Sequence, residues 1–188
     1  MLGYNGVKTV KGKVTKVPEV GGDAGNTYHG QTVRGKNYHV RIGSNARNHL
    51  ENSEGLFRKG GQGVKGGHNM DAFYGELRNQ GFNIDDCIVS KTPHPTIEGI
   101  YEIEYRIPAI DNKKSIIPNQ YKNISRPKTV YDSNVFSNDE IYKMGVEAMQ
   151  NGKMNGYIVE GFSSNGLKFT GYIDKATGEI TNFFPTLK

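Results

Sequence analysis

The stretch "LKFTGYIDKATGEITNFFP", residues 167–185, gives the clearest indication of the fold. In its first half, apolar residues and glycine alternate with polar ones, at Leu167, Phe169, Gly171 and Ile173. Such alternation is typical of a strand with one buried face. "DKATGE" predicts a hairpin turn between this strand and the strand "EITNFFP". The preceding stretch "GYIVEGFS", residues 156–163, predicts another strand, so the C-terminal part should be antiparallel sheet.

Helical patterns precede these strands. "SNDEIYKMGVEAMQNG", residues 137–152, begins with Ser137 and Glu140 at the spacing of a capping box, and Gly152 ends the pattern. "NMDAFYGELRNQG", residues 69–81, has Met70, Phe73 and Leu77 at helical spacing. "SNARNHLEN", residues 44–52, predicts a short helix capped by Ser44 or Asn45. Because helices come early and antiparallel strands come late, the sequence predicts an α+β fold.

The rest of the chain adds strands and one irregular region. "GIYEIEYRIPA", residues 99–109, alternates strictly and predicts a half-buried strand, and "DDCIVSK", residues 85–91, predicts another. Residues 111–134 are polar and predict irregular structure. Residues 1–26 predict a short basic strand and a linker, or the remnant of an upstream region, so the compact domain should occupy residues 27–188.

Composition narrows the classes of partner. The chain has 188 residues and a net charge of +5, which suits a polyanion such as RNA, or an acidic protein. Cys87 is the only cysteine, so no disulfide within the chain and no cysteine-based zinc site can form. No apolar run approaches the roughly 20 residues of a membrane span, and the first residues lack the apolar core of a signal peptide.

Candidate chemistry gathers around the glycine-rich stretch before the predicted helix at residues 69–81. Gly66, Gly67 and His68 precede that helix, where backbone amides can attract a phosphate. His49 ends the predicted helix at residues 44–52, and histidine can act as acid or base near neutral pH. Lys128 could stabilise negative charge beside a phosphate. The alternative is a flexible loop with structural or surface histidines. His94, between two prolines, is interpreted as a loop residue, and His29 and His39 as surface histidines rather than ligands of a second site.

Six blocks, in this order, carry a family resemblance. They are "NHLEN", "GLFRKGG", "GGHNMDAF", "GIYEIEYRIPAID", "PKTVYDSNVFS" and "KFTGYIDKATGEITNFFP". Together they resemble the bacterial EndoU ribonuclease domain over roughly residues 45–188. Such domains typically form the toxic C-terminal tip of large secreted polymorphic or contact-dependent growth inhibition toxins. The resemblance implies a fold of the barnase–EndoU–colicin–RelE type, in which N-terminal helices pack on an antiparallel sheet.

The resemblance also implies catalytic roles. It assigns two catalytic histidines to His49 and His68, and a catalytic lysine to Lys128, with Lys168 as the rival. Gly67, in the glycine-rich turn before the predicted helix at residues 69–81, is expected to contact the substrate, and no cofactor or metal is expected to take part.

The closing block implies the contacts to a base. A hydroxyl contact falls on Thr181, or on Asn182 if the register shifts by one residue. Phe184 stands where the family usually has tyrosine. Phe184 can still stack on a base but cannot donate a hydroxyl hydrogen bond, so selectivity for uridine does not carry over.

These features predict a toxin that cleaves RNA, with tRNA as a candidate, through attack of the 2′-OH and without metal. The expected partners are the RNA and a cognate immunity protein of acidic character, with no membrane contact by this segment. The expected route is delivery from a producer cell into the cytoplasm of a target cell. Two other functions stay open from the sequence: a non-catalytic RNA-binding module and a metal-dependent DNA nuclease.

Overall fold

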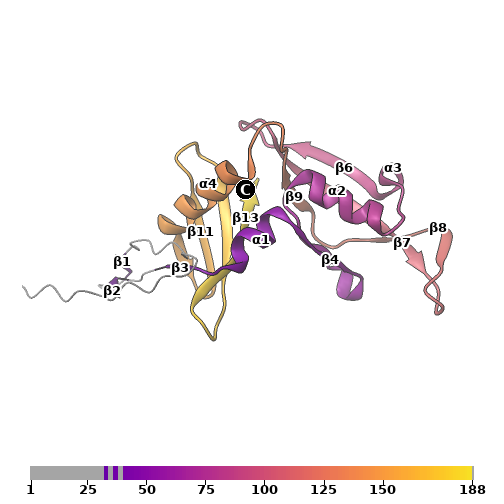
Figure 1. Cartoon of the computed structure of the whole chain (residues 1–188), viewed down its shortest axis with the longest axis horizontal. Coiled ribbons are helices and arrows are strands. Elements are labelled where there is room, and N and C mark those ends of the chain that lie inside the picture. Colours follow the sequence, from indigo (N-terminus) through magenta and orange to yellow (C-terminus); the bar gives the residue numbers. More distant parts are fainter. Residues whose placement is uncertain (1–31, 34–35, 38–39, 188) are drawn as a thin grey trace, which may run out of the picture.

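The computed structural model describes residues 32–33, 36–37 and 40–187, which form two lobes joined by a short helix (Figure 1). Helices and mostly antiparallel strands occupy separate layers, so the predicted α+β class is confirmed. The predicted boundary between residues 1–26 and 27–188 lies outside the described residues and stays a prediction. Among the first described residues, Thr32–Val33 (β1) pairs with Lys36–Asn37 (β2). No helix in the described ranges is long and apolar enough to cross a membrane.

The first lobe is a five-stranded sheet covered on one face by a long helix. Its strand order is β10-β11-β12-β13-β3, antiparallel except that β13 and β3 run parallel. The strands are Lys153–Asn155 (β10), Ile158–Phe162 (β11), Lys168–Ile173 (β12), Glu179–Thr186 (β13) and Arg41–Ile42 (β3). The helix is Asn138–Gln150 (α4), and it has the predicted capping box between Ser137 and Glu140. The predicted hairpin of β12 and β13 is also confirmed.

Glycine lets α4 approach this sheet closely. A Cβ atom added to Gly161 on β11 would lie 1.8 Å from the carbonyl oxygen of Ala148, and one added to Gly145 on α4 would lie 2.2 Å from the ring of Phe183. The buried core of this lobe is therefore packed between α4 and the face of the sheet that carries Phe169 and Phe183. The opposite face of the sheet is left for other contacts.

The second lobe is built on the long strand β7. One edge of β7 pairs with β6, and the other edge pairs with β9 and then with β8. The elements are Met70–Asn79 (α2), Ile84–Cys87 (α3), Ile88–Pro93 (β6), Ile100–Ile110 (β7), Ile116–Asn123 (β8) and Lys128–Tyr131 (β9). A second buried core lies between α2 and this sheet. The predicted helix at residues 69–81 and the predicted strand at residues 99–109 are both confirmed.

Two predictions for this lobe were wrong. The strand predicted at residues 85–91 begins only at Ile88, because Asn83 caps the amide of Asp85 and the chain first makes one helical turn. Residues 111–134 are not irregular but contain β8 and β9. The polar residues of β8 fit a strand that is mostly exposed, whereas all four residues of β9 are buried.

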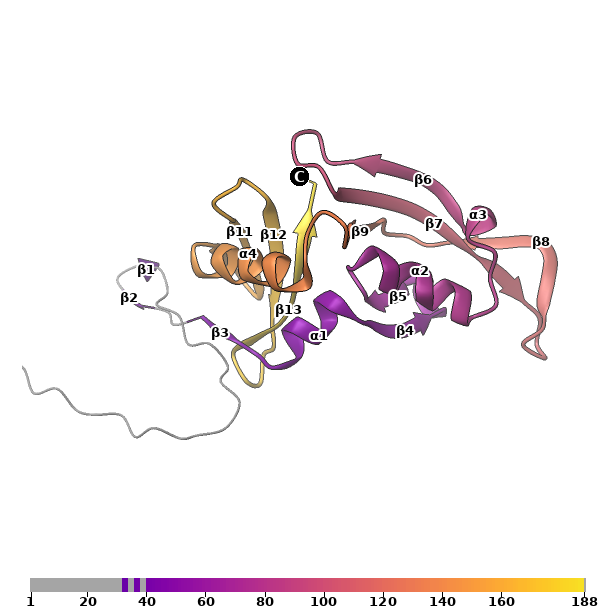
Figure 2. The same cartoon turned by 45° about the horizontal axis from the view of Figure 1, so that its top comes forward.

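The two lobes meet along Asn45–Glu51 (α1), the entry to α2, and β9 (Figure 2). After α1 the chain forms a hairpin of Ser53–Phe57 (β4) and Gly63–Gly66 (β5), with a 3₁₀ turn at Lys59–Gly61 between them. The amide of His68 then donates to the carbonyl of Leu50 (2.8 Å), and the amide of Tyr131 donates to the carbonyl of His68 (2.8 Å). These bonds connect α1 to β9 through the residue that precedes α2.

Candidate active site

His49 lies in the last turn of α1, at the joint between the lobes, and is buried. Its Nδ1 atom is 2.9 Å from the Oε1 atom of Glu54 on β4. Glu54 also pairs with Lys65 (2.7 Å). Partial burial opposes ionisation of Glu54, but hydrogen bonds from Lys65 and His49 outweigh it and lower its pKa to about 2. An ionised carboxylate only accepts, so Nδ1 of His49 carries the proton and Nε2 is the basic nitrogen.

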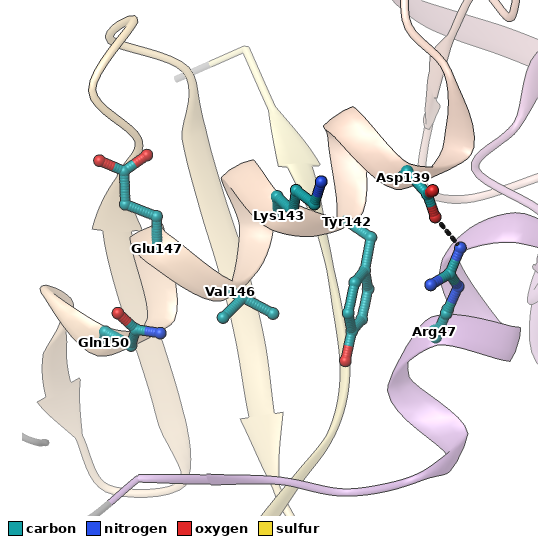
Figure 3. Close-up of a pocket in the computed structure, with 7 residues that line it drawn as sticks. All are labelled: Arg47, Asp139, Tyr142, Lys143, Val146, Glu147 and Gln150. Carbon is teal, nitrogen blue, oxygen red and sulfur yellow. Dashed lines mark hydrogen bonds and ion pairs between the residues drawn. The ribbon is translucent and has the colours of Figure 1, made fainter. Parts of the chain in front are cut away.

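The helix that carries His49 is tied to α4 by Arg47. Arg47 forms ion pairs with Asp139 on α4 and with Glu51 on its own helix, and its guanidinium lies 5.1 Å from the ring centre of Tyr142. Figure 3 shows Arg47 and Asp139 facing each other, with the ring of Tyr142 beside Arg47. These contacts fix α1 on the first lobe, and with it the position of His49.

His68 reaches the same place from the end of β5. Its Nδ1 atom is 2.6 Å from the carbonyl oxygen of Thr129 on β9. A carbonyl cannot donate, so Nδ1 is again the protonated nitrogen and Nε2 is free to accept. Burial first, and the charge of Lys128 second, lower the pKa of His68 well below its ordinary value. His68 is therefore neutral at pH 7.

Lys128, the first residue of β9, lies directly beside His68. Its Nζ atom is 3.3 Å from the Nε2 atom of His68 and donates to the carbonyls of Gly66 and Val64. Burial lowers the pKa of Lys128 to about 7 and that of His49 below its ordinary value, although Glu54 opposes the shift in each case. The pKa of Lys128 therefore lies near neutral pH, where this amine can exist with or without its proton.

The three side chains share one cleft. The ring centres of His49 and His68 are 5.6 Å apart and the rings are tilted by 42°. Both rings and Lys128 line a cavity of about 580 Å³, which Phe184 and Tyr172 close from the β13 and β12 side. An arrangement of two imidazoles and a buried amine suits proton transfer at two points of one substrate, one imidazole accepting a proton and the other, in its protonated form, giving one, with charge stabilisation between them.

Similarity to known proteins agrees with this geometry. Residues 39–187 match the family described as bacterial EndoU nuclease. The chain belongs to the bacterial EndoU nuclease family. It is 33% identical over 141 residues to the tRNA nuclease CdiA of Yersinia mollaretii and 31% identical over 147 residues to the tRNA nuclease CdiA of Escherichia coli strain STEC_O31. These matches cover 73% and 75% of this chain but only 4% of each relative.

The EndoU resemblance inferred from the sequence is thus confirmed, and the structure brings most of the predicted site residues together. His49, His68, Lys128 and Phe184 all line the cleft. Lys168, the rival to Lys128, instead pairs with Glu160 on the neighbouring strand at 2.8 Å, and it does not line the cleft.

Thr181 and Asn182 lie on β13 but do not line the cleft that contains His49, His68 and Lys128. Tyr172 pairs with Asn182 and Ile173 pairs with Ile180, so Thr181 is the extra residue of a β-bulge. The Oδ1 atom of Asn182 is buried without a hydrogen-bond partner among the described residues. Contacts between either side chain and the substrate stay predictions.

The glycine turn before α2 is not arranged to bind an anion through its amides. The amide of Gly67 donates to the carbonyls of His49 (3.0 Å) and Asn52 (2.7 Å), and that of His68 is occupied by Leu50. Gly66 and Gly67 have φ values of +61° and +63°, and a Cβ atom on Gly66 would lie 2.6 Å from the carbonyl oxygen of Asn52. The glycines are therefore needed for the turn that brings His68 beside His49.

Sequence reasoning missed three residues of the site. Glu54 orients His49, the carbonyl of Thr129 orients His68, and Tyr172 lines the cleft beside Phe184. Glu54 follows His49 by five residues, but no pattern says that the chain folds back between them. Thr129 contacts His68 through its main-chain carbonyl, which every residue type has, so the residue type at this position could not reveal the contact. Tyr172 stands in an alternating strand pattern, which signals a strand but not the site that one of its faces meets.

The described ranges contain no group of three or more His, Cys, Asp or Glu side chains that could hold a metal ion. His94 lies outside the cleft and accepts hydrogen bonds from the amides of Thr96 and Ile97. His29 and His39 fall outside the described residues.

Proposed function

We propose that this chain is a metal-independent endoribonuclease that cleaves RNA by attack of the ribose 2′-OH on the adjacent phosphate. The observation that carries the proposal is the pair of imidazoles, with ring centres 5.6 Å apart, in one cleft beside Lys128. Each histidine has its Nδ1 atom engaged by an acceptor, so each presents Nε2 for proton transfer.

The reaction uses the three side chains in one step. One histidine takes the proton of the 2′-OH, the 2′-oxygen forms a bond to phosphorus, and the bond to the 5′-oxygen breaks. The other histidine enters the cycle protonated and gives its proton to the leaving 5′-oxygen. Lys128 in its ammonium form stabilises the charge that accumulates on the phosphate oxygens. The products are a 2′,3′-cyclic phosphate and a 5′-OH end.

The substrate class and the biological setting extend this proposal. Two relatives are named tRNA nucleases, so tRNA is the first substrate to test. The same relatives carry the name CdiA, which supports a toxin that a producer cell delivers into the cytoplasm of a target cell. A producer of such a toxin needs an immunity protein, and the net charge of +5 favours an acidic one because opposite charge speeds association. The barnase–EndoU–colicin–RelE arrangement of helices on the sheet belongs to this proposal as well.

The test is cleavage of purified tRNA in the presence of EDTA by the parent, His49→Ala and His68→Ala. Each substitution should slow cleavage by roughly 10²–10⁴-fold, which is the usual contribution of one acid–base group. His94→Ala is the matched control, because His94 is a histidine outside the cleft, and it should cleave like the parent. Equal rates for all four proteins, or cleavage that EDTA abolishes, would refute the mechanism. Binding of RNA without turnover by the parent would indicate a binding module instead.

A further inference from the structure

Phe184 is held against a catalytic side chain. Its ring stacks on the imidazole of His68, with ring centres 4.5 Å apart and planes within 2° of parallel. The face of Phe184 that meets His68 is therefore not available to a base. Since Thr129 already holds Nδ1 of His68, the Phe184 ring adds a second constraint on the orientation of the imidazole.

Tyr172 is the next aromatic ring along the cleft. Its ring centre is 6.1 Å from that of Phe184, at 27°, and it lines the same cavity. Tyr172 is only partly buried, so part of its ring remains open to a ligand.

The sheet explains why Tyr172 faces the cleft. Residues paired across β12 and β13 share a face, and Thr170 pairs with Phe184 while Tyr172 pairs with Asn182. The alternate residues face α4, since a Cβ atom on Gly171 would lie 2.3 Å from the sulfur of Met149. Tyr172 and Phe184 thus stand on the face that α4 leaves uncovered. Ile158, which pairs with Tyr172 on β11 and is 39% exposed, continues this face away from the cleft.

We propose that Tyr172 stacks on the base of a nucleotide beside the scissile linkage, and that Phe184 is a positioning residue for His68. The inference rests on the proposed RNA cleavage and names the groups that hold the substrate in that site. Stacking needs only the π-face of a base, so the Tyr172 contact tolerates every base.

The test uses a short RNA with one cleavage site, in which each nucleotide flanking that site is replaced in turn by an abasic one. With the parent, removing the base that Tyr172 contacts should lower kcat/KM by roughly 5- to 150-fold, the range measured for one stacked base. Tyr172→Leu should show the same loss with the intact RNA and no further loss with the abasic RNA. The loss should lie mainly in KM.

Four variants complete the test. Tyr172→Phe keeps the ring and should act like the parent. Tyr157→Leu makes the same kind of change at a tyrosine that is 51% exposed and does not line the cleft, and it should also act like the parent. Phe184→Leu should lower kcat with little change in KM, and Phe184→Tyr should restore it. A parent that cleaves every abasic RNA like the intact one refutes the Tyr172 contact whether or not Tyr172→Leu folds.

The outcomes distinguish failure of the roles proposed for Tyr172 and Phe184 from failure of the proposed RNA cleavage. Losses from Tyr172→Leu and from the abasic nucleotide that multiply would also refute the contact, because they would be independent. A loss in KM rather than kcat for Phe184→Leu would refute its positioning role. Failure of the parent to cleave any RNA would instead refute the proposed function.

Discussion

Replacing Lys128 with methionine should make the protein more stable near neutral pH while it abolishes RNA cleavage. Methionine keeps an unbranched chain of similar length and removes the buried charge. Burial lowers the pKa of Lys128 from the ordinary 10.5 to about 7. Between these values the unfolded chain binds more protons than the folded one, so stability from this group rises with pH.

The size of the effect follows from these two pKa values. Relative to a lysine whose pKa does not change on folding, linkage makes the folded state less stable by about 4 kcal/mol at pH 7 and by about 2 kcal/mol at pH 9. Lys128→Met also loses the hydrogen bonds to the carbonyls of Gly66 and Val64, but that loss changes little over this range. The free energy of unfolding of Lys128→Met minus that of the parent should therefore fall by about 2 kcal/mol from pH 7 to pH 9.

The assay is urea denaturation of the parent and Lys128→Met at pH 7 and pH 9 with matched ionic strength. Lys113→Met is the control, since Lys113 is exposed and the same substitution there removes no buried amine. A difference for Lys128→Met that stays constant or grows from pH 7 to pH 9 would refute the buried, easily deprotonated amine.

Further predictions concern the groups that hold the two histidines. Glu54→Gln removes the carboxylate that orients His49 and favours its charged form, so kcat should fall by on the order of 10²-fold or more and the limb of the pH–rate profile that reports His49 should move to lower pH. An unchanged profile would count against that role. Gly66→Ala forces a side chain into a backbone with φ of +61°, with its Cβ atom 2.6 Å from the carbonyl oxygen of Asn52, so the free energy of unfolding should drop by roughly 1–3 kcal/mol in urea denaturation. Gly156→Ala is its control, because Gly156 also has a positive φ, +62°, but meets nothing within 4 Å, so the excess loss at Gly66 measures the clash.

Local patterns predicted the parts of the fold that local chemistry determines. The residue types of Ser137 and Glu140, at the spacing of a capping box, predict the start of α4, and the strict alternation along β7 predicts which of its faces is buried. Strand β9 was missed because its four residues lie in a polar region, and their burial comes from β7 and the joint between the lobes. Burial that comes from packing against distant segments produces no periodic pattern of apolar and polar residues in a segment of only four residues.

The site divides in the same way. Residue chemistry and the EndoU resemblance were enough to select His49, His68, Lys128 and Phe184, all of which the fold brings to one cleft. The sequence does not reveal that the amide of Gly67 is already used by the end of α1, and a contact between Gly67 and the substrate stays a prediction. The partners that orient the histidines come from β4 and β9, and only the folded chain shows them.

The most direct test of the central claim uses two RNAs that differ by one oxygen atom. One is all-ribose with a single cleavage site, and the other has 2′-deoxyribose on the 5′ side of that site. Two histidines acting on one ribose–phosphate linkage predict that the parent leaves a 2′,3′-cyclic phosphate on the first RNA and does not cut the second at that bond. Equal cleavage of both RNAs would contradict the account, since it would mean that the nucleophile is not the 2′-OH.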